Sequence, residues 1–376
     1  MTKGEFSCII IQTANSKQQT AVDPLLSKRV NSLRFLLIIF VVIIHNGIST
    51  KTFSQRNIMV VIPDYVENVQ RLIGIITAIA VPMFFLFSAY FLYFKEQKYI
   101  PTMKKKCRTI LLPYFLWNLL LVLFYYLVQT LPFTRQFFMT NPDYLIKNYG
   151  VIDWIDVFWG KITYRNGDGH PLLGPFWFLR DLFILNIFFI GIKKLIDKFP
   201  IGIFILFFIL WTNNINIYIV SPEALLFFAF GYYIVKYDLG IKNINEIKIL
   251  DLSVIYGITI ILEYFFVGSM PILHKINILI GCMFILKISQ YFIENIKLYK
   301  ILDRLEKYQF FVYAAHIIIM SQLLKIYTKV IPLNGVYILV GYFFMIFFGI
   351  FVSLIFGIIF KKLLPKLYGI LTGGRI

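Results

Sequence analysis

Long runs of apolar residues, separated by short charged or Pro/Gly-containing links, are the dominant pattern along this chain. A helix needs about 20 apolar residues to cross the ~30 Å hydrocarbon core of a bilayer. The pattern predicts helices at residues 29–50, 71–94, 109–131, 176–195, 199–212, 221–237, 250–268, 271–293, 308–330 and 334–360. The fifth run is short and an Asn-rich segment follows it, so the pattern leaves the count open between nine and ten.

The composition supports this assignment to membranes. The chain is 59% hydrophobic and 15% charged, with a mean hydropathy of +0.77. A water-soluble domain could not hide this much apolar surface in its core. We therefore expect an all-α fold, a polytopic integral membrane bundle of about ten transmembrane helices.

The distribution of charge orients the predicted helices. The formal net charge is +18, from 37 Lys and Arg against 19 Asp and Glu, and the basic residues cluster in short loops. That pattern is typical of membrane topology and not of nucleic-acid binding. With the N-terminus inside, every Lys- and Arg-rich loop faces the cytoplasm, which favours ten helices with both termini cytoplasmic in a multi-pass protein of the cell membrane.

The ends of the chain are expected to be tails around one membrane domain. Residues 1–28 are polar and carry no secretory signal, which predicts a cytoplasmic N-terminal tail, followed by a transmembrane domain at 29–362 and a cytoplasmic tail at 363–376. The three cysteines, Cys8, Cys107 and Cys282, are isolated in sequence and lack metal-ligand spacing. We expect neither a disulfide framework nor a metal site.

The first predicted helix contains the main candidate site. Arg34 and His45 bracket ten uninterrupted apolar residues. On a helix this 11-residue step is about 16 Å of rise and three turns plus roughly 20°, so both side chains lie on one face. An ionisable group inside a membrane helix is costly and indicates a functional site. The alternative is that Arg34 extends to lipid phosphates and His45 marks the far interface.

Motifs in later helices extend this pattern. The second helix contains Val-Pro-Met-Phe-Phe-Leu-Phe-Ser-Ala-Tyr at 81–90, Arg108 precedes Leu-Leu-Pro-Tyr at 111–114, Trp-Phe-Leu begins at Trp177, and Phe-Val-Tyr-Ala-Ala-His ends at His316. In this order, over residues 29–330, the motifs resemble the signature of the membrane-bound acyltransferase family 3. Ala89 replaces the usual Gly of that signature, and the absence of a hydrolase-like domain after the last helix points to stand-alone members.

The resemblance implies an enzyme that moves an acyl group, expected to be acetyl, from cytosolic acyl-coenzyme A to a hydroxyl of a surface polysaccharide or lipid-linked glycan. Acyl-coenzyme A is then a donor substrate and no cofactor is bound permanently. Imidazole is suited to take the hydroxyl proton near neutral pH, so His45 is the expected catalytic base. Arg34 is expected to bind the donor, since a guanidinium forks onto phosphates.

Further candidates have structural alternatives. Ser88, Lys105 and Arg108 are candidates for donor binding, although a basic run more often faces anionic headgroups. Glu263 could orient His45 as a third catalytic residue, contact sugar hydroxyls, or be a satisfied structural carboxylate at the interface.

On the acceptor side, Trp177, Arg180, Asp181 and His316 are candidates for substrate binding. Arg180 and Asp181 could instead form a structural ion pair. His316 could make an interhelical hydrogen bond. His170 is expected to be an exposed loop residue.

The main alternative function is transport or flipping of a glycan precursor, since ten helices with buried polar groups suit that as well. The discriminating feature is internal symmetry, and no second copy of the Arg34 and His45 pattern occurs between residues 199 and 360. A non-catalytic scaffold leaves this pair without a reason. Expected partners are membrane lipids, the donor and the glycan acceptor, with no nucleic acid. The acyl chain, the acceptor and the oligomeric state are left open.

Overall fold

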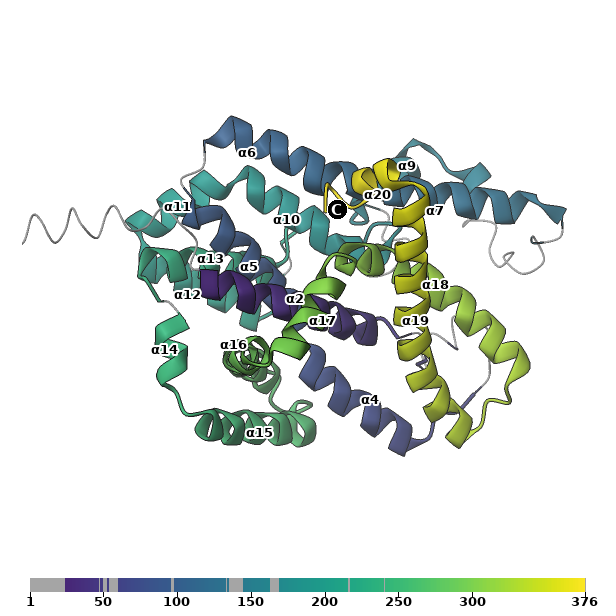
Figure 1. The fold of residues 1–376 in the computed structure, drawn as a ribbon. Helices are drawn as coiled ribbons and strands as arrows, with labels where there is room; N and C mark the ends of the chain where they lie inside the picture. The colour runs from purple at the N-terminus through teal and green to yellow at the C-terminus, as the bar shows by residue number, and fades with distance from the viewer. Residues whose placement is uncertain are drawn as a thin grey trace, which may run out of the picture.

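The computed structural model describes residues 24–46, 48, 49, 53, 60–95, 98–132, 134, 145–162, 169–215, 217–239 and 241–375 of the chain. Within these ranges every regular element is a helix and no strand forms, which confirms the predicted all-α class (Figure 1). Residues 1–23 of the predicted N-terminal tail, with Cys8, lie outside the described residues. The last residues of that predicted tail belong to the first helix, which begins at Pro24.

The longer helices in chain order are α2 (Pro24–Ile44), α4 (Asp64–Thr77), α5 (Ala80–Phe94), α7 (Leu112–Thr130), α10 (Trp177–Ile187), α11 (Phe189–Lys198), α12 (Pro200–Thr212), α13 (Pro222–Lys236), α15 (Ile249–Phe266), α16 (Ile272–Glu294), α17 (Ile296–Glu306), α18 (Gln309–Val330) and α19 (Gly335–Leu363). The shorter elements are α6 (Tyr99–Lys106), the π-helical turn η1 (Cys107–Leu111), η3 (Ile146–Asn148), α9 (Val151–Trp159), η4 (Gly174–Phe176), α14 (Ile241–Glu246) and α20 (Pro365–Leu371).

Six helical segments of the described chain are long and apolar enough to cross a membrane. They are Asp64–Phe94, Tyr99–Thr130, Ile249–Phe266, Ile272–Glu294, Gln309–Val330 and Gly335–Leu363. A seventh results if Gly174–Ile187 and Phe189–Lys198, bent by 64° relative to each other, are one span. The predicted count of about ten is therefore not confirmed.

The remaining predicted spans differ from these six in charge or length. α2 has 21 residues but carries three basic side chains, at positions 28, 29 and 34. α12 has 13 residues and α13 has 15, which at 1.5 Å per residue is well short of a ~30 Å core.

Helix α2 lies in the middle of the described bundle. It contacts α4, α5, α16, α17, α18 and α19, as its central place in Figure 1 shows. Its side chains at Val30, Leu33, Leu37 and Val42 are fully buried. A helix that is apolar on all sides is one surrounded by other elements. The apolar run between Arg34 and His45 thus forms the centre of the fold.

Helices α5 and α13 pack closely because a glycine removes the side chain at their contact. A Cβ at Gly231 would lie 2.6 Å from the Ala89 Cβ and 2.6 Å from the Leu86 carbonyl oxygen. Small residues let membrane helices approach closely. The resembled signature usually has glycine at the position of Ala89. Here α5 and α13 approach closely because the glycine, Gly231, is on α13 instead.

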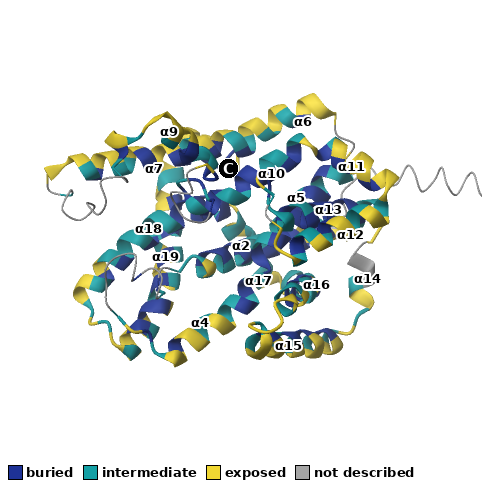
Figure 2. Ribbon diagram, turned by 180° about the vertical axis from the view of Figure 1, so that it is seen from behind, coloured by how far each residue is buried: buried dark blue, intermediate teal, exposed yellow. Residues whose placement is uncertain are grey.

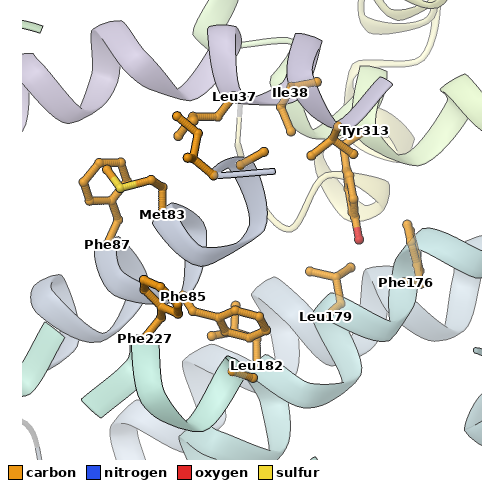
Figure 3. Packing of buried hydrophobic residues seen from close by; sticks show 14 of the residues in the cluster. Leu37, Ile38, Met83, Phe85, Phe87, Phe176, Leu179, Leu182, Phe227 and Tyr313 are labelled. Carbon is orange, nitrogen blue, oxygen red and sulfur yellow. The ribbon is translucent and has the colours of Figure 1, made fainter. Parts of the chain in front are cut away.

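Apolar residues fill the interior and also cover much of the outside. In Figure 3, Leu37 of α2, Met83 of α5, Leu182 of α10 and Tyr313 of α18 belong to one buried cluster. Figure 2 shows exposed positions along the outer helix α15. On α19 the exposed positions include the aromatic residues Phe343, Phe347 and Phe351. Large apolar side chains on the outside are what contact with lipid requires.

The segment at 363–376, predicted as a cytoplasmic tail, is folded against the bundle over its described part. Helix α20 packs against α7, and the Trp117 indole N–H donates a 3.0 Å hydrogen bond to the Leu371 carbonyl. The Tyr368 hydroxyl donates to the Lys307 carbonyl at 3.2 Å. These contacts between distant parts of the chain are not visible in the hydropathy pattern.

Candidate active site

Arg34 and His45 line one cavity of about 160 Å³ in the described structure, which confirms that the 11-residue step places them on one face. The cavity lies between α2, α5, η4 with α10, and α18. Its other lining residues are Ile38, Val41, Val81, Phe84, Ser88, Pro175, Trp177, Phe178, Leu179, Leu182, Gln309, Phe310, Tyr313 and Arg375. Both residues therefore line a space inside the protein. This argues against the alternative in which Arg34 extends to lipid phosphates and His45 marks the far interface.

The hydrogen bond of His45 determines which ring nitrogen is available for chemistry. Nδ1 lies 2.8 Å from the Val41 carbonyl oxygen, one turn back on α2. A carbonyl can only accept, so Nδ1 carries the proton in this contact and the neutral ring leaves a lone pair on Nε2. Among the described residues, no hydrogen bond occupies that nitrogen. His45 is thus arranged as a proton acceptor facing a cavity.

His316 is a second imidazole that lies beside His45. The two ring centroids are 5.3 Å apart, and His316 is completely buried. Its Nδ1 lies 2.7 Å from the Tyr313 carbonyl oxygen, and its Nε2 has no hydrogen-bond partner in the described structure. The bond is within α18, so the interhelical alternative is wrong. The structure places His316 beside His45 and not with the other candidates for substrate binding.

Arg34 is held by an acidic partner that the sequence analysis missed. Its Nη1 is 2.8 Å from Glu306 Oε1, at the end of α17, and the same oxygen accepts a 2.8 Å hydrogen bond from the Gln309 amide. The guanidinium carbon lies 5.8 Å from the centre of the Phe91 ring. The only sequence signal for Glu306 is its position three residues before Gln309 at the start of the His316 helix.

The candidates for donor binding divide into one inside the cavity and two outside it. Ser88 lines the cavity with Arg34. Lys105 and Arg108 are exposed and absent from its lining. Thr109, directly after Arg108, contributes its backbone carbonyl to a contact with Arg375 near the cavity. The basic run thus lies near the site without entering it.

A second, more polar cavity of about 460 Å³ collects three of the predicted substrate-binding residues. Trp177, Arg180 and Asp181 line it together. Trp177 also lines the Arg34 and His45 cavity, so one indole borders both spaces. His170 borders the polar cavity as well, with its ring 5.9 Å from that of Trp177 at an angle of 13°. His170 is therefore half-buried and not the exposed loop residue that the sequence suggested.

Arg180 and Asp181 form the predicted ion pair. Arg180 Nη2 lies 3.0 Å from Asp181 Oδ1, and its Nη1 donates to the carbonyls of Trp159 and Gly169. The second Asp181 oxygen accepts from the Ser221 backbone N–H at 2.8 Å. This buried pair is fully hydrogen-bonded and connects two loops to α10, as buried charges require. Burial lowers the pKa of nearby Lys161, and the Asp181 charge acts against that shift.

Polar and aromatic side chains complete the wall of the second cavity. Trp211 donates its indole N–H to Glu223 at 3.3 Å, and the Lys275 ammonium donates to the Asn214 side-chain oxygen at 3.0 Å. The same ammonium lies 4.9 Å from the Trp211 ring centre. Indole faces beside carboxylate, amide and ammonium groups suit a ligand with both apolar faces and hydroxyls.

Glu263 is not part of either cavity. Its Oε1 pairs with His274 Nδ1 at 2.6 Å, and it is absent from the lining of both spaces. The expected contact with His45 is not found among the described residues, because the loop after α15 brings His274 to this carboxylate. Within the same part of the chain, no three His, Cys, Asp or Glu side chains are placed to hold a metal ion.

Comparison with known proteins identifies the family. A family model described as an acyltransferase domain, that of acyltransferase family 3, matches residues 27–362, nearly the whole chain. Searches of curated proteins and of solved structures returned no match. The family match and the long apolar helices fit a multi-pass membrane acyltransferase. The chain belongs to acyltransferase family 3.

Proposed function

We propose that this protein is an integral membrane O-acyltransferase of the cell membrane, with both termini in the cytoplasm. It moves an acyl group, in the first instance acetyl, from cytosolic acyl-coenzyme A to a hydroxyl of a surface polysaccharide or lipid-linked glycan. The observation that carries the proposal is the position of His45, which lines a cavity together with Arg34 and whose Nε2 has no hydrogen bond among the described residues.

The acceptor hydroxyl must lose a proton for the reaction to proceed, and His45 Nε2 accepts it. The hydroxyl oxygen bonds to the thioester carbonyl carbon as the proton moves to the imidazole. The C–S bond then breaks, and the leaving thiolate takes the proton back from the imidazolium. Imidazole suits this exchange because its neutral form accepts a proton and its protonated form gives the proton back without a large energy difference near neutral pH.

The two cavities suggest how the substrates meet. The Arg34 cavity, at about 160 Å³, is smaller than the ~300–1,000 Å³ of pockets that enclose whole ligands, so it suits one end of the donor. The polar cavity beyond Trp177 suits the glycan, because indole faces and fixed polar groups line it. In this arrangement the acceptor approaches His45 past Trp177, from the side opposite Arg34.

The test is transfer of labelled acetyl from acetyl-coenzyme A to membrane glycolipid by the purified protein in detergent. We expect labelled, alkali-labile ester on the glycolipid. The rival function, transport or flipping of a precursor, draws on the 64° break between α10 and α11, since broken helices also occur in transporters. Movement of glycolipid across vesicle membranes without ester formation would favour the rival.

A further inference from the structure

The C-terminal segment enters the donor end of the site. Its backbone is fixed against the turn that follows α6, because Gly373 has a φ of +65° and a Cβ there would lie 2.4 Å from the Thr109 carbonyl oxygen. Tyr368 and Thr372 are completely buried. A positive φ combined with such close backbone contact is a position that glycine alone occupies easily. The segment is therefore a packed wall that ends beside the cavity.

Arg375, near the end of this C-terminal segment, lines the cavity. Its guanidinium carbon lies 4.6 Å from the centre of the Phe310 ring, and both residues line the space that contains Arg34. One guanidinium nitrogen, Nη1, donates to the Thr372 carbonyl at 2.8 Å and more weakly to the Thr109 carbonyl at 3.3 Å. Arg375 is an exposed residue that also lines the cavity, so it lies at the mouth. The stacked, hydrogen-bonded guanidinium is held in a defined place.

The charges around this mouth do not balance. Arg375 lies close enough to Arg34 and Glu306 for their charges to affect its pKa. Lys106 lies close enough to Arg375 and Lys105 for the same effect. Arg34 already pairs with Glu306. Two guanidiniums beside one carboxylate leave a net positive charge that attracts an anion, and guanidiniums favour an oxyanion that accepts several hydrogen bonds.

We propose that Arg375 and Arg34 together bind a phosphate group at the mouth of the His45 cavity. This proposal rests on the proposed function, in which the cavity holds only the acyl end of the donor. The bound phosphate then belongs to the phosphate-bearing part of the same donor. An anionic lipid headgroup offers the same phosphate chemistry. The last residues of the chain are thus part of the substrate site.

The experiment measures binding of coenzyme A and of inorganic pyrophosphate to the full-length protein in phosphatidylcholine nanodiscs. Arg375→Gln should weaken both by about 10- to 100-fold, the loss expected for hydrogen bonds to a charged group. The affinity of Arg375→Lys should lie between those of the unmodified protein and Arg375→Gln, because lysine keeps the charge but cannot make the two parallel hydrogen bonds of a guanidinium. Lys366→Gln is the matched control, since Lys366 is an exposed cation on α20 outside the cavity lining.

A second set of nanodiscs containing phosphatidylglycerol separates the two sources of phosphate. Arg375-dependent binding of coenzyme A that persists in these discs assigns the site to the donor. Competition by phosphatidylglycerol that Arg375→Gln abolishes assigns it to a lipid. Unweakened binding of both probes by Arg375→Gln, or no binding by the unmodified protein, would overturn the proposal.

Two further readouts separate binding from a structural role and from the proposed function. Arg375→Gln should raise KM for acetyl-coenzyme A while kcat and the thermal midpoint stay close to those of the unmodified protein. A lower thermal midpoint with a parallel fall in kcat would show a purely structural role. Binding of coenzyme A and pyrophosphate does not require acyl transfer. The binding experiment can therefore support the phosphate site even if no acetyl transfer is found, and acetyl transfer can be found even if Arg375 does not bind phosphate.

Discussion

The ring centroids of His45, directly after α2, and of His316, on α18, lie 5.3 Å apart although the two residues are far from each other in the sequence. Each ring has Nδ1 within hydrogen-bond distance of a carbonyl three or four residues earlier in the chain, Val41 for the first and Tyr313 for the second. Both therefore leave Nε2 without a proton in the neutral form. The second imidazole packs beside the first and limits how it can turn.

Replacing His316 with Asn should slow transfer without abolishing it. Asn keeps a donor near the position of Nδ1 but removes the ring that packs beside His45, and a misplaced catalytic group costs up to about 10²-fold in rate. The measurement is kcat for acetyl transfer by the purified variant. A rate equal to that of the unmodified protein would show that His316 has no part in positioning His45.

Arg34→Lys should raise KM for the donor and leave the fold intact. A single ammonium cannot pair with Glu306 and fork onto a donor phosphate at the same time, which the guanidinium can. The ion pair is partly exposed, so its loss should change the free energy of unfolding by no more than about 1 kcal/mol. Steady-state kinetics with acetyl-coenzyme A and thermal unfolding in detergent check both parts. An unchanged KM would remove Arg34 from donor binding.

Glu263→Gln should leave acetyl transfer within about twofold of the unmodified enzyme. The carboxylate pairs with His274 and does not reach the His45 cavity, and Gln retains an oxygen that accepts from the histidine ring. A loss of tenfold or more in kcat, with the thermal midpoint preserved, would restore Glu263 to the catalytic group that the sequence suggested.

Gly231→Ala should destabilise the contact between α5 and α13 by about 1–3 kcal/mol, the usual cost of overpacking. The added methyl would lie 2.6 Å from the Ala89 Cβ and from the Leu86 carbonyl oxygen. Gly257→Ala on α15 is the matched control, since a Cβ there meets no atom within 4 Å. Adding Ala89→Gly should recover part of the loss, as thermal unfolding in detergent can measure. Equal midpoints for the two single variants would contradict the packing account.

The sequence was sufficient to predict the relative positions of residues that belong to one helix. The spacing of Arg34 and His45 placed them on one face because α2 is helical from Arg34 to Ile44 and the backbone N–H of His45 still donates to the Val41 carbonyl. It was insufficient for contacts between distant segments. Nothing local indicates that Glu306 pairs with Arg34 or that Arg375 returns to the same cavity. Such contacts follow from the packing of the whole bundle.

Helix boundaries show a similar limit. The hydropathy pattern began the second span at 71, whereas α4 begins at Asp64. The first two turns of α4 are polar on one side, and their helical start is set by Pro63 and by acidic residues in the first turn. A search for continuous apolar runs misses such an amphipathic start, and it also counts short helices such as α12 as spans.

The most direct test of the account is acetyl transfer by His45→Asn. Asn preserves a donor toward the Val41 carbonyl and removes the Nε2 lone pair, and His274→Asn is the matched control because it makes the same change at a histidine outside both cavities. We predict that His45→Asn loses at least about 10²-fold in kcat, the usual contribution of a general base, while it still binds coenzyme A and stays in the membrane. The control should transfer acetyl at nearly the rate of the unmodified protein. Transfer by His45→Asn at a rate close to that of the control would contradict the account.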